Sequence, residues 1–208
     1  MQRTLVLATA IAVSLGFALG AQAQSAPSST TTTTPAHRPH NTATETGRNV
    51  DQQKRIEQGL QSGQLSTGEA RKLEAGQARI DKTEQRDLRN GTLSASERAQ
   101  IQRQQNRESH AIHADKHNAT KGNPDSLKSN LEQADVQRNI NQQQRIHNGV
   151  ANGSLTNRET SHLEGSEAHV SHMEARRDTL RQTGRIQRAD NRDSRRIHRA
   201  KHNARDRH

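Results

Sequence analysis

The feature that most constrains the fold is an internal repeat, which appears when the chain is aligned with itself at an offset of 90 residues. Residues 50–56 (Val-Asp-Gln-Gln-Lys-Arg-Ile) then align with residues 140–146 (Ile-Asn-Gln-Gln-Gln-Arg-Ile). A later block, Lys-His-Asn-Ala, occurs at residues 116–119 and again at 201–204. Further residues between these two blocks are identical in both copies. In the first copy they are Gly59, Gly63, Leu65, Glu69, Leu73, Glu74 and Ala78, and in the second they are Gly149, Gly153, Leu155, Glu159, Leu163, Glu164 and Ala168. We therefore expect two similar structural units.

The composition favours helices and provides little for a large core. Only 27% of the residues are apolar, and Phe17 is the only aromatic residue. Gln, Glu, Arg and Ala are abundant, and these residues favour helices. Leu73 and Ile80 are seven residues apart, which places them on one narrow helix face. The sequence thus predicts an all-α fold of duplicated helical hairpins, extended or loosely packed, whose apolar stripes suit a thin hairpin or self-association.

Three turns carry a helix-capping pattern, in which Gly is followed by Ser or Thr and then by Glu three residues later. A calcium loop has a similar second half, but it needs oxygen ligands five and three residues before its Gly. Arg86 and Leu88 occupy those positions before Gly91 and provide none. We therefore expect these turns to cap helices rather than to bind calcium. They are Gly63-Ser66-Glu69, Gly91-Ser94-Glu97 and Gly153-Thr156-Glu159.

The N-terminal region has the pattern of an exported protein. Arg3 precedes an apolar run from Leu5 to Leu19, and Ala21-Gln22-Ala23 forms a small-residue cleavage site. The run is too short for a membrane-spanning helix, which needs about 20 residues. We predict a periplasmic or secreted protein with no transmembrane segment after cleavage. The predicted organisation is a signal peptide (1–23), a disordered Ser/Thr/Pro tether (24–47), a first repeat (48–120), a linker or helix start (121–136) and a second repeat (137–208).

The repeats resemble a group of exported bacterial helical-repeat proteins of unknown function. The shared units are Gln-Gln-Arg-Ile, then Gly-x-Leu-Ser/Thr-x-x-Glu, then Lys-His-Asn-Ala. Here they occur at residues 52–56, 63–69 and 116–119, and again at 142–146, 153–159 and 201–204. The resemblance implies an exported helical protein and implies no activity.

A stripe of arginines is the strongest candidate binding feature. The chain carries a net charge of +10, and residues 176–208 contain 12 Lys and Arg against four Asp. Six arginines in this segment recur at spacings of three and four residues, which places them on one helix face. Such a face suits contacts with phosphates of an anionic polymer or membrane surface. Without aromatic residues or a base-reading motif, we expect no sequence-specific nucleic-acid binding. The six are Arg181, Arg185, Arg188, Arg192, Arg195 and Arg199.

Histidine pairs provide an alternative site. His113 and His117 are four residues apart, as are His198 and His202, so each pair points two imidazoles to one helix side. Two ligands suit only weak divalent metal binding, because zinc usually takes four. The chain has no Cys and no recognisable nucleophile turn, and we expect neither an enzyme nor a cofactor. The predicted function is anionic surface or polymer binding; weak metal binding in a stress protein and structural self-association are the alternatives.

Overall fold

The structure, a computed structural model, describes residues 42–177 and 180–203, apart from the side chains of Leu180 and Arg181, and these residues are helical with short connections. The predicted signal peptide and residues 24–41 of the tether lie outside the described residues. The prediction of an all-α fold is confirmed. The helices are α1 (Ala43–Gln61), α2 (Thr67–Asp87), the short 3-10 helix η1 (Leu88–Asn90), α3 (Ala95–His117), α4 (Leu127–Ala151), α5 (Asn157–Ala175) and α6 (Leu180–Lys201).

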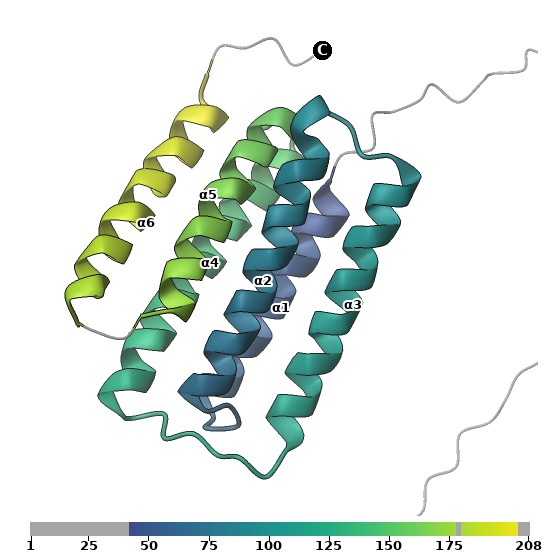
Figure 1. The fold of residues 1–208 in the computed structure, drawn as a ribbon. Coiled ribbons are helices and arrows are strands. Elements are labelled where there is room, and N and C mark those ends of the chain that lie inside the picture. Colours follow the sequence, from purple (N-terminus) through teal and green to yellow (C-terminus); the bar gives the residue numbers. More distant parts are fainter. Residues whose placement is uncertain (1–41, 178–179, 204–208) are drawn as a thin grey trace, which may run out of the picture. The chain divides into compact units, whose positions relative to one another are not determined.

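The two copies of the repeat pair with each other along four central helices. The most extensive packing is between α2 and α5, followed by that between α1 and α4. In Figure 1, α2 and α5 lie in front of α1 and α4, with α3 on one side and α6 on the other. The apolar stripes that predicted a thin hairpin or pairing between molecules are therefore used between the two copies of one chain. None of the described helices has an apolar stretch that could cross a membrane.

Aliphatic side chains form separate small clusters. One cluster lies around Ile56, Leu60 and Ile112. A second lies around Ile146, Leu155 and Ile197, and a third contains Val170, Ile186 and Ala189. Leu and Ile side chains at these positions are almost completely buried, so each cluster excludes water although no aromatic residue contributes.

The turns between helices have the predicted caps. Capping boxes are present at Ser66 with Glu69, at Ser94 with Glu97 and at Thr156 with Glu159. Gly63, Gly91 and Gly153 have φ values of 69°, 89° and 73°, which glycine adopts without strain. The prediction that these turns cap helices is confirmed.

The predicted boundary between tether and first repeat is wrong by about one helical turn. The tether was expected to end at residue 47, but α1 begins at Ala43. Distant residues hold this first turn, because Arg98 pairs with Glu45 at 2.8 Å and the Thr46 hydroxyl contacts His147 Nδ1 at 3.2 Å. A Ser- and Thr-rich segment thus joins a helix through tertiary contacts that local composition does not reveal.

Candidate metal centre

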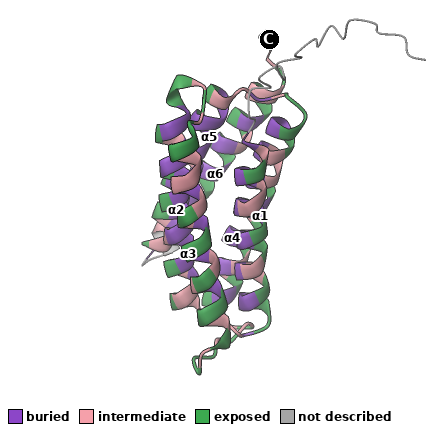
Figure 2. Cartoon of the chain, turned by 90° about the vertical axis from the view of Figure 1, so that its right-hand side faces the viewer, coloured by how far each residue is buried: buried purple, intermediate pink, exposed green. Residues whose placement is uncertain are grey.

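The interface between α2 and α5 is lined by acidic and amide side chains. Glu74, Gln77, Asp81 and Glu84 on α2 face inward, and none is more than 1% exposed. The matching residues of α5, namely Glu164, Glu167, Ser171 and Glu174, are equally buried. Figure 2 shows the buried residues on the helix faces that are turned toward each other. Carboxylates are almost never fully buried unless they are paired with an opposite charge or a hydrogen-bond donor. The buried acids of this interface therefore need such partners.

Three of these carboxylates come together at one point. Asp81 and Glu84 lie one turn apart on α2, and Glu164 reaches them from α5. One oxygen from each carboxylate lies within 4.8 Å of the others. We call Asp81, Glu84 and Glu164 the carboxylate triad.

Amide side chains from α1 and α4 hold the triad in place. Asn49 Nδ2 donates to Glu84 Oε2 at 3.0 Å and lies 3.5 Å from Asp81 Oδ1. Gln143 Nε2 donates to Glu164 Oε2 at 2.9 Å. Asn49 is fixed in turn, because its Oδ1 accepts from Gln105 Nε2 at 2.7 Å. These donors orient one oxygen of each carboxylate and leave the other available.

The other oxygens of the triad have no protein partner. Asp81 Oδ2, Glu84 Oε1 and Glu164 Oε1 accept no hydrogen bond from the described part of the chain. No Lys, Arg or His among the described residues forms an ion pair with the three carboxylates. Burying such charges without a counter-charge costs several kcal/mol for each ion, so the arrangement favours a bound cation or protons.

The pKa values of the triad reflect this environment. Burial, followed by the charge of Glu164, raises the pKa of Asp81 well above its ordinary value. The same two causes raise the pKa of Glu84, and burial raises the pKa of Glu164 to about 7. The raised pKa values mean that these carboxyl groups retain protons in the absence of a cation, and a cation that binds between them displaces these protons.

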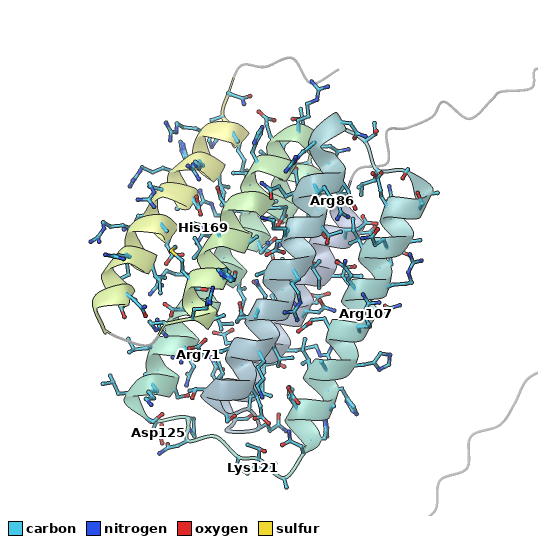
Figure 3. All side chains as sticks on the ribbon, viewed as in Figure 1. Arg71, Arg86, Arg107, Lys121, Asp125 and His169 are labelled. Atoms are coloured by element: carbon cyan, nitrogen blue, oxygen red, sulfur yellow. The ribbon has the colours of Figure 1, made fainter. Side chains whose placement is uncertain are left out.

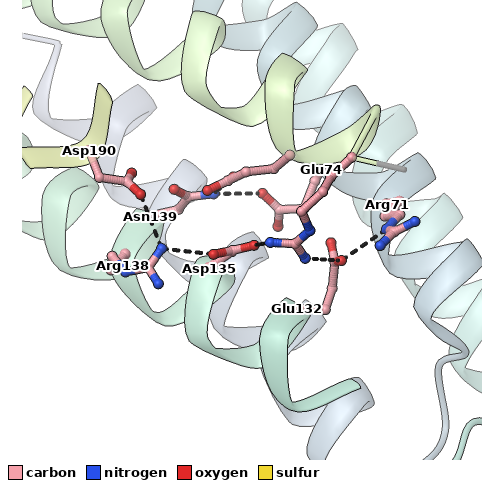
Figure 4. Close-up of polar contacts among 9 residues, drawn as sticks. Arg71, Glu74, Glu132, Asp135, Arg138, Asn139 and Asp190 are labelled. Atoms are coloured by element: carbon pink, nitrogen blue, oxygen red, sulfur yellow. Dashed lines mark hydrogen bonds and ion pairs between the residues drawn. The ribbon is translucent and has the colours of Figure 1, made fainter. Parts of the chain in front are cut away.

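Another group of buried acids, on α4 and α6, is by contrast paired with arginines. Arg177, which is 4% exposed, forms ion pairs with Glu132 and Asp135. Arg138 bridges Asp135 at 2.7 Å and Asp190 at 3.0 Å, and Arg71 contacts Glu132 at 3.0 Å (Figure 4). The described part of the chain therefore has guanidinium counter-charges for these acids and none for the triad.

Sequence reasoning missed the triad because the burial of an acidic side chain depends on which helices cover it. A signal was present in the sequence. Glu74, Gln77, Asp81 and Glu84 are spaced by three, four and three residues, which is the spacing of an inward helix face. The same spacing recurs 90 residues later with Glu at three of the four positions.

The arginine stripe lies on the exposed face of α6. Ile186, Ala189 and Ile197 are buried against the bundle, and five arginines are exposed. None of their five guanidinium groups forms an ion pair or hydrogen bond with a described residue. The side chain of Arg181 lies outside the described residues. We call the five the arginine ridge: Arg185, Arg188, Arg192, Arg195 and Arg199.

The two histidine pairs are exposed and lie far apart. His113 and His117 have ring centroids 4.2 Å apart on α3, and those of His198 and His202 are 4.5 Å apart on α6. The His117 ring donates from Nδ1 to the carbonyl oxygen of His113 at 2.7 Å. Because α3 and α6 flank opposite sides of the central helices, the structure does not bring the pairs together (Figure 1).

A basic groove runs along the outer surface of α2 and α5. Its volume is about 1040 Å³, and its floor includes Ala75, Ala78 and Ala168. No acidic residue lines it. Figure 3 shows Arg71 and His169 on this face. The cationic residues of the groove are Arg71, Lys72, Arg79, Lys82 and Arg176, with His169 and His172 beside them.

Searches against protein-family models, curated proteins and solved structures found no match to this chain.

Proposed function

We propose that the protein is a non-enzymatic binding protein that holds a hard divalent cation at the carboxylate triad. The observation that carries the proposal is the meeting of three buried carboxylates from both repeats, each with an oxygen that has no partner among the described residues. A cation there would neutralise the charges and bind α2 to α5. It would thereby couple the association of the two repeats to metal binding.

The ligand set favours calcium. Carboxylate oxygens are hard ligands, which suit Ca²⁺, Mg²⁺ and Mn²⁺ rather than zinc or copper. Mg²⁺ demands near-ideal octahedral geometry, whereas Ca²⁺ accepts an irregular set of oxygen ligands such as carboxylates from two helices. Ca–O distances of about 2.3–2.6 Å place opposite ligands of one ion about 5 Å apart, which fits the spread of the triad oxygens.

Calorimetric titration of the full chain tests this function. After EDTA treatment and dialysis, the protein is titrated separately with Ca²⁺, Mg²⁺, Mn²⁺ and Zn²⁺. We expect saturable, tight binding of Ca²⁺, and this tight binding is lost in Asp81→Asn and in Glu84→Gln. Each change replaces a carboxylate by an amide of nearly the same shape, so the buried charge is removed while packing is kept.

A control variant separates the triad from general charge effects. Asp51 is an exposed acid on α1, and Asp51→Asn removes the same formal charge from the surface. This variant should bind Ca²⁺ as the wild type does. If the wild type binds none of the four ions, or if all three variants bind equally well, the proposed function is wrong.

A second candidate function is binding to anionic surfaces or polymers outside the cell. The signal-peptide pattern of residues 1–23 supports export to the periplasm or beyond. The observation that favours the binding is the arginine ridge, whose five guanidinium groups are exposed and form no ion pair or hydrogen bond within residues 42–177 and 180–203. The basic groove on α2 and α5 extends the cationic surface of the molecule.

The ridge should be tested by substitution rather than by truncation. Removing residues 176–208 would also remove buried Arg177, Ile186 and Ile197, which pack inside the bundle. Replacing the five ridge arginines by Gln leaves those contacts intact. We expect salt-sensitive retention on an anionic matrix by the wild type and loss of most of it in this variant. Equal retention of the two proteins would show that the arginine ridge is not the surface that binds the matrix.

A further inference from the structure

The internal repeat produces a second set of residues that matches the carboxylate triad. At the offset of 90 residues, Glu84 corresponds to Glu174 and Glu164 corresponds to Glu74. Asn49 corresponds to Asn139, and Gln143 corresponds to Gln53. Only one ligand position differs in charge, because Ser171 occupies the place of Asp81.

In the structure one amide again joins two of these acids. Asn139 Nδ2 donates to Glu174 Oε2 at 2.7 Å and to Glu74 Oε2 at 3.2 Å, so it joins α5 to α2, whereas Asn49 contacts two acids of α2. Figure 4 shows Asn139 and Glu74 in this contact. Asn139, Glu74 and Glu174 are each at most 1% exposed.

The second set also has buried oxygens without a partner. Glu74 Oε1 and Glu174 Oε1 accept no hydrogen bond from the described residues. Ser171, which is 1% exposed, likewise has a hydroxyl oxygen with no described partner. A buried serine hydroxyl normally finds a hydrogen-bond partner, and it is a suitable neutral ligand for a hard cation.

Two differences make this set a poorer cation site than the triad. Ser171 provides no charge where Asp81 provides a carboxylate. In addition, Arg177 stands where the first repeat has Asp87, and its guanidinium pairs with Glu132 and Asp135. The charges of these same two acids act on Glu74. One fewer carboxylate and a neighbouring cation both weaken the attraction for a metal ion.

We infer that Glu74, Ser171 and Glu174 form a second, weaker cation site, related to the triad by the internal repeat. This inference rests on the proposed function, because it assigns the same ligand class to the matching residues. Ten residues separate Glu74 from Glu84 on α2, so the two sites are roughly 15 Å apart along the helix axis. Each site takes ligands from both repeats, and two bound ions would fasten α2 to α5 at two points.

The test is the number of Ca²⁺ ions bound by the full chain, measured by equilibrium dialysis and by calorimetry. We expect the wild type to bind two ions, the second at least tenfold more weakly than the first. Glu174→Gln should remove only the weaker ion, and Glu84→Gln only the tighter one. Ser171→Asp should tighten the weaker site at least tenfold, because it restores the third carboxylate. Circular dichroism at 222 nm checks that each variant is folded.

The possible outcomes separate this inference from the proposed function. A wild type that binds a single ion, with neither Glu174→Gln nor Ser171→Asp changing the binding, would overturn the second site and leave the triad standing. A wild type that binds no ion would overturn both. Ser171→Asp is expected to increase the affinity for Ca²⁺. It therefore still tests the second site if Glu174→Gln fails to fold.

Discussion

Asn49 shows how a single side chain organises the candidate site. It accepts from Gln105 and donates toward two carboxylates of the triad, so it links α1, α2 and α3 through one amide. A buried amide stabilises the folded protein only while each of its polar atoms has a hydrogen-bond partner. Its effect on the site can therefore be tested by changing one atom.

Asn49→Asp should destabilise the metal-free protein and be rescued by a cation. The change removes an amide donor and places a fourth carboxylate beside Asp81 and Glu84. An uncompensated buried charge lowers the free energy of unfolding by about 3–5 kcal/mol. With saturating Ca²⁺ the loss should fall to less than half, because the added carboxylate gains a counter-charge. Urea unfolding followed by circular dichroism, in EDTA and in Ca²⁺, measures this.

Asn141→Asp is the matched control, because Asn141 is exposed on α4. It should change the free energy of unfolding by no more than about 0.5 kcal/mol in either condition. An equal loss for Asn49→Asp with and without Ca²⁺ would contradict a cation beside Asn49.

Glu108 should make the stability depend on pH. Burial raises the pKa of its carboxyl to about 7, with Arg79 opposing the shift and Asp115 adding to it. The folded protein therefore holds a proton that the unfolded chain releases above pH 4.5. The contribution of this protonated carboxyl to the stability of the folded protein is fully present below about pH 4.5. It is lost as the pH rises to about 7, and the free energy of unfolding then falls by roughly 2–3 kcal/mol.

Glu108→Gln removes this titration. The difference in stability between pH 4.5 and pH 7.5, measured by urea unfolding in EDTA, should shrink in the variant by most of that amount. Asp51→Asn, at an exposed site, should leave the difference unchanged. The same pH dependence in Glu108→Gln and the wild type would show that this carboxyl is not the source.

Sequence reasoning located surface features more readily than buried ones. The arginine ridge follows from spacing alone, because long cations on one helix face are normally solvated. The triad could not be assigned in that way, because burial of Asp81 depends on which helix covers it. Its ligand from α5 is 80 residues away from Glu84 in the sequence. Only the repeated three-four-three spacing of the acids indicated an inward face.

At the scale of the elements, local rules predicted where helices start and stop inside each repeat. Ser66, Ser94 and Thr156 each cap a helix as predicted, because a capping box needs only residues four positions apart or closer. The start of α1 at Ala43 was missed because it depends on contacts with Arg98 and His147. Local sequence patterns do not predict helix boundaries that depend on tertiary contacts.

The end of the first helix in each repeat depends on a glycine that touches the next turn. A Cβ atom at Gly149 would lie 2.6 Å from the Cδ1 and Cγ atoms of Leu155, which is buried. Gly149→Ala should therefore lower the free energy of unfolding by about 2 kcal/mol through overpacking, despite the better helix propensity of alanine. Chemical unfolding of the variant measures the loss.

Gly184→Ala provides the matched control on α6. Its added Cβ would meet only Arg188 Nη1, at 3.6 Å, which is ordinary contact. Here the helix propensity should dominate and stabilise the protein by up to about 1 kcal/mol. If both variants were stabilised alike, close packing of Gly149 against Leu155 would be refuted.

At the scale of the whole molecule, two repeats with sparse apolar residues share an interface rich in acids. The aliphatic clusters are small, and α2 meets α5 through Glu, Asp and Gln side chains. Arginines pair with buried acids on α4 and α6, whereas the triad has no such partner among the described residues. The bundle should therefore be marginally stable without a cation and considerably more stable with one.

The size of this effect follows from linkage. A ligand that binds only the folded protein and is present at 100 times its dissociation constant stabilises it by about 2.7 kcal/mol. For a chain of this length, each kcal/mol raises the melting temperature by about 2–4 °C. A single site thus predicts an increase of roughly 5–10 °C.

The measurement that tests the central claim most directly is thermal unfolding of the full chain, followed by circular dichroism at 222 nm, in EDTA and in 1 mM Ca²⁺. It is made on the wild type and on Asp81→Asn/Glu84→Gln. We predict that Ca²⁺ raises the melting temperature of the wild type by at least 5 °C and that of the double variant, which keeps only the weaker site, by less than half as much. A wild type indifferent to Ca²⁺, or an equal increase in both proteins, would contradict a cation site at Asp81, Glu84 and Glu164.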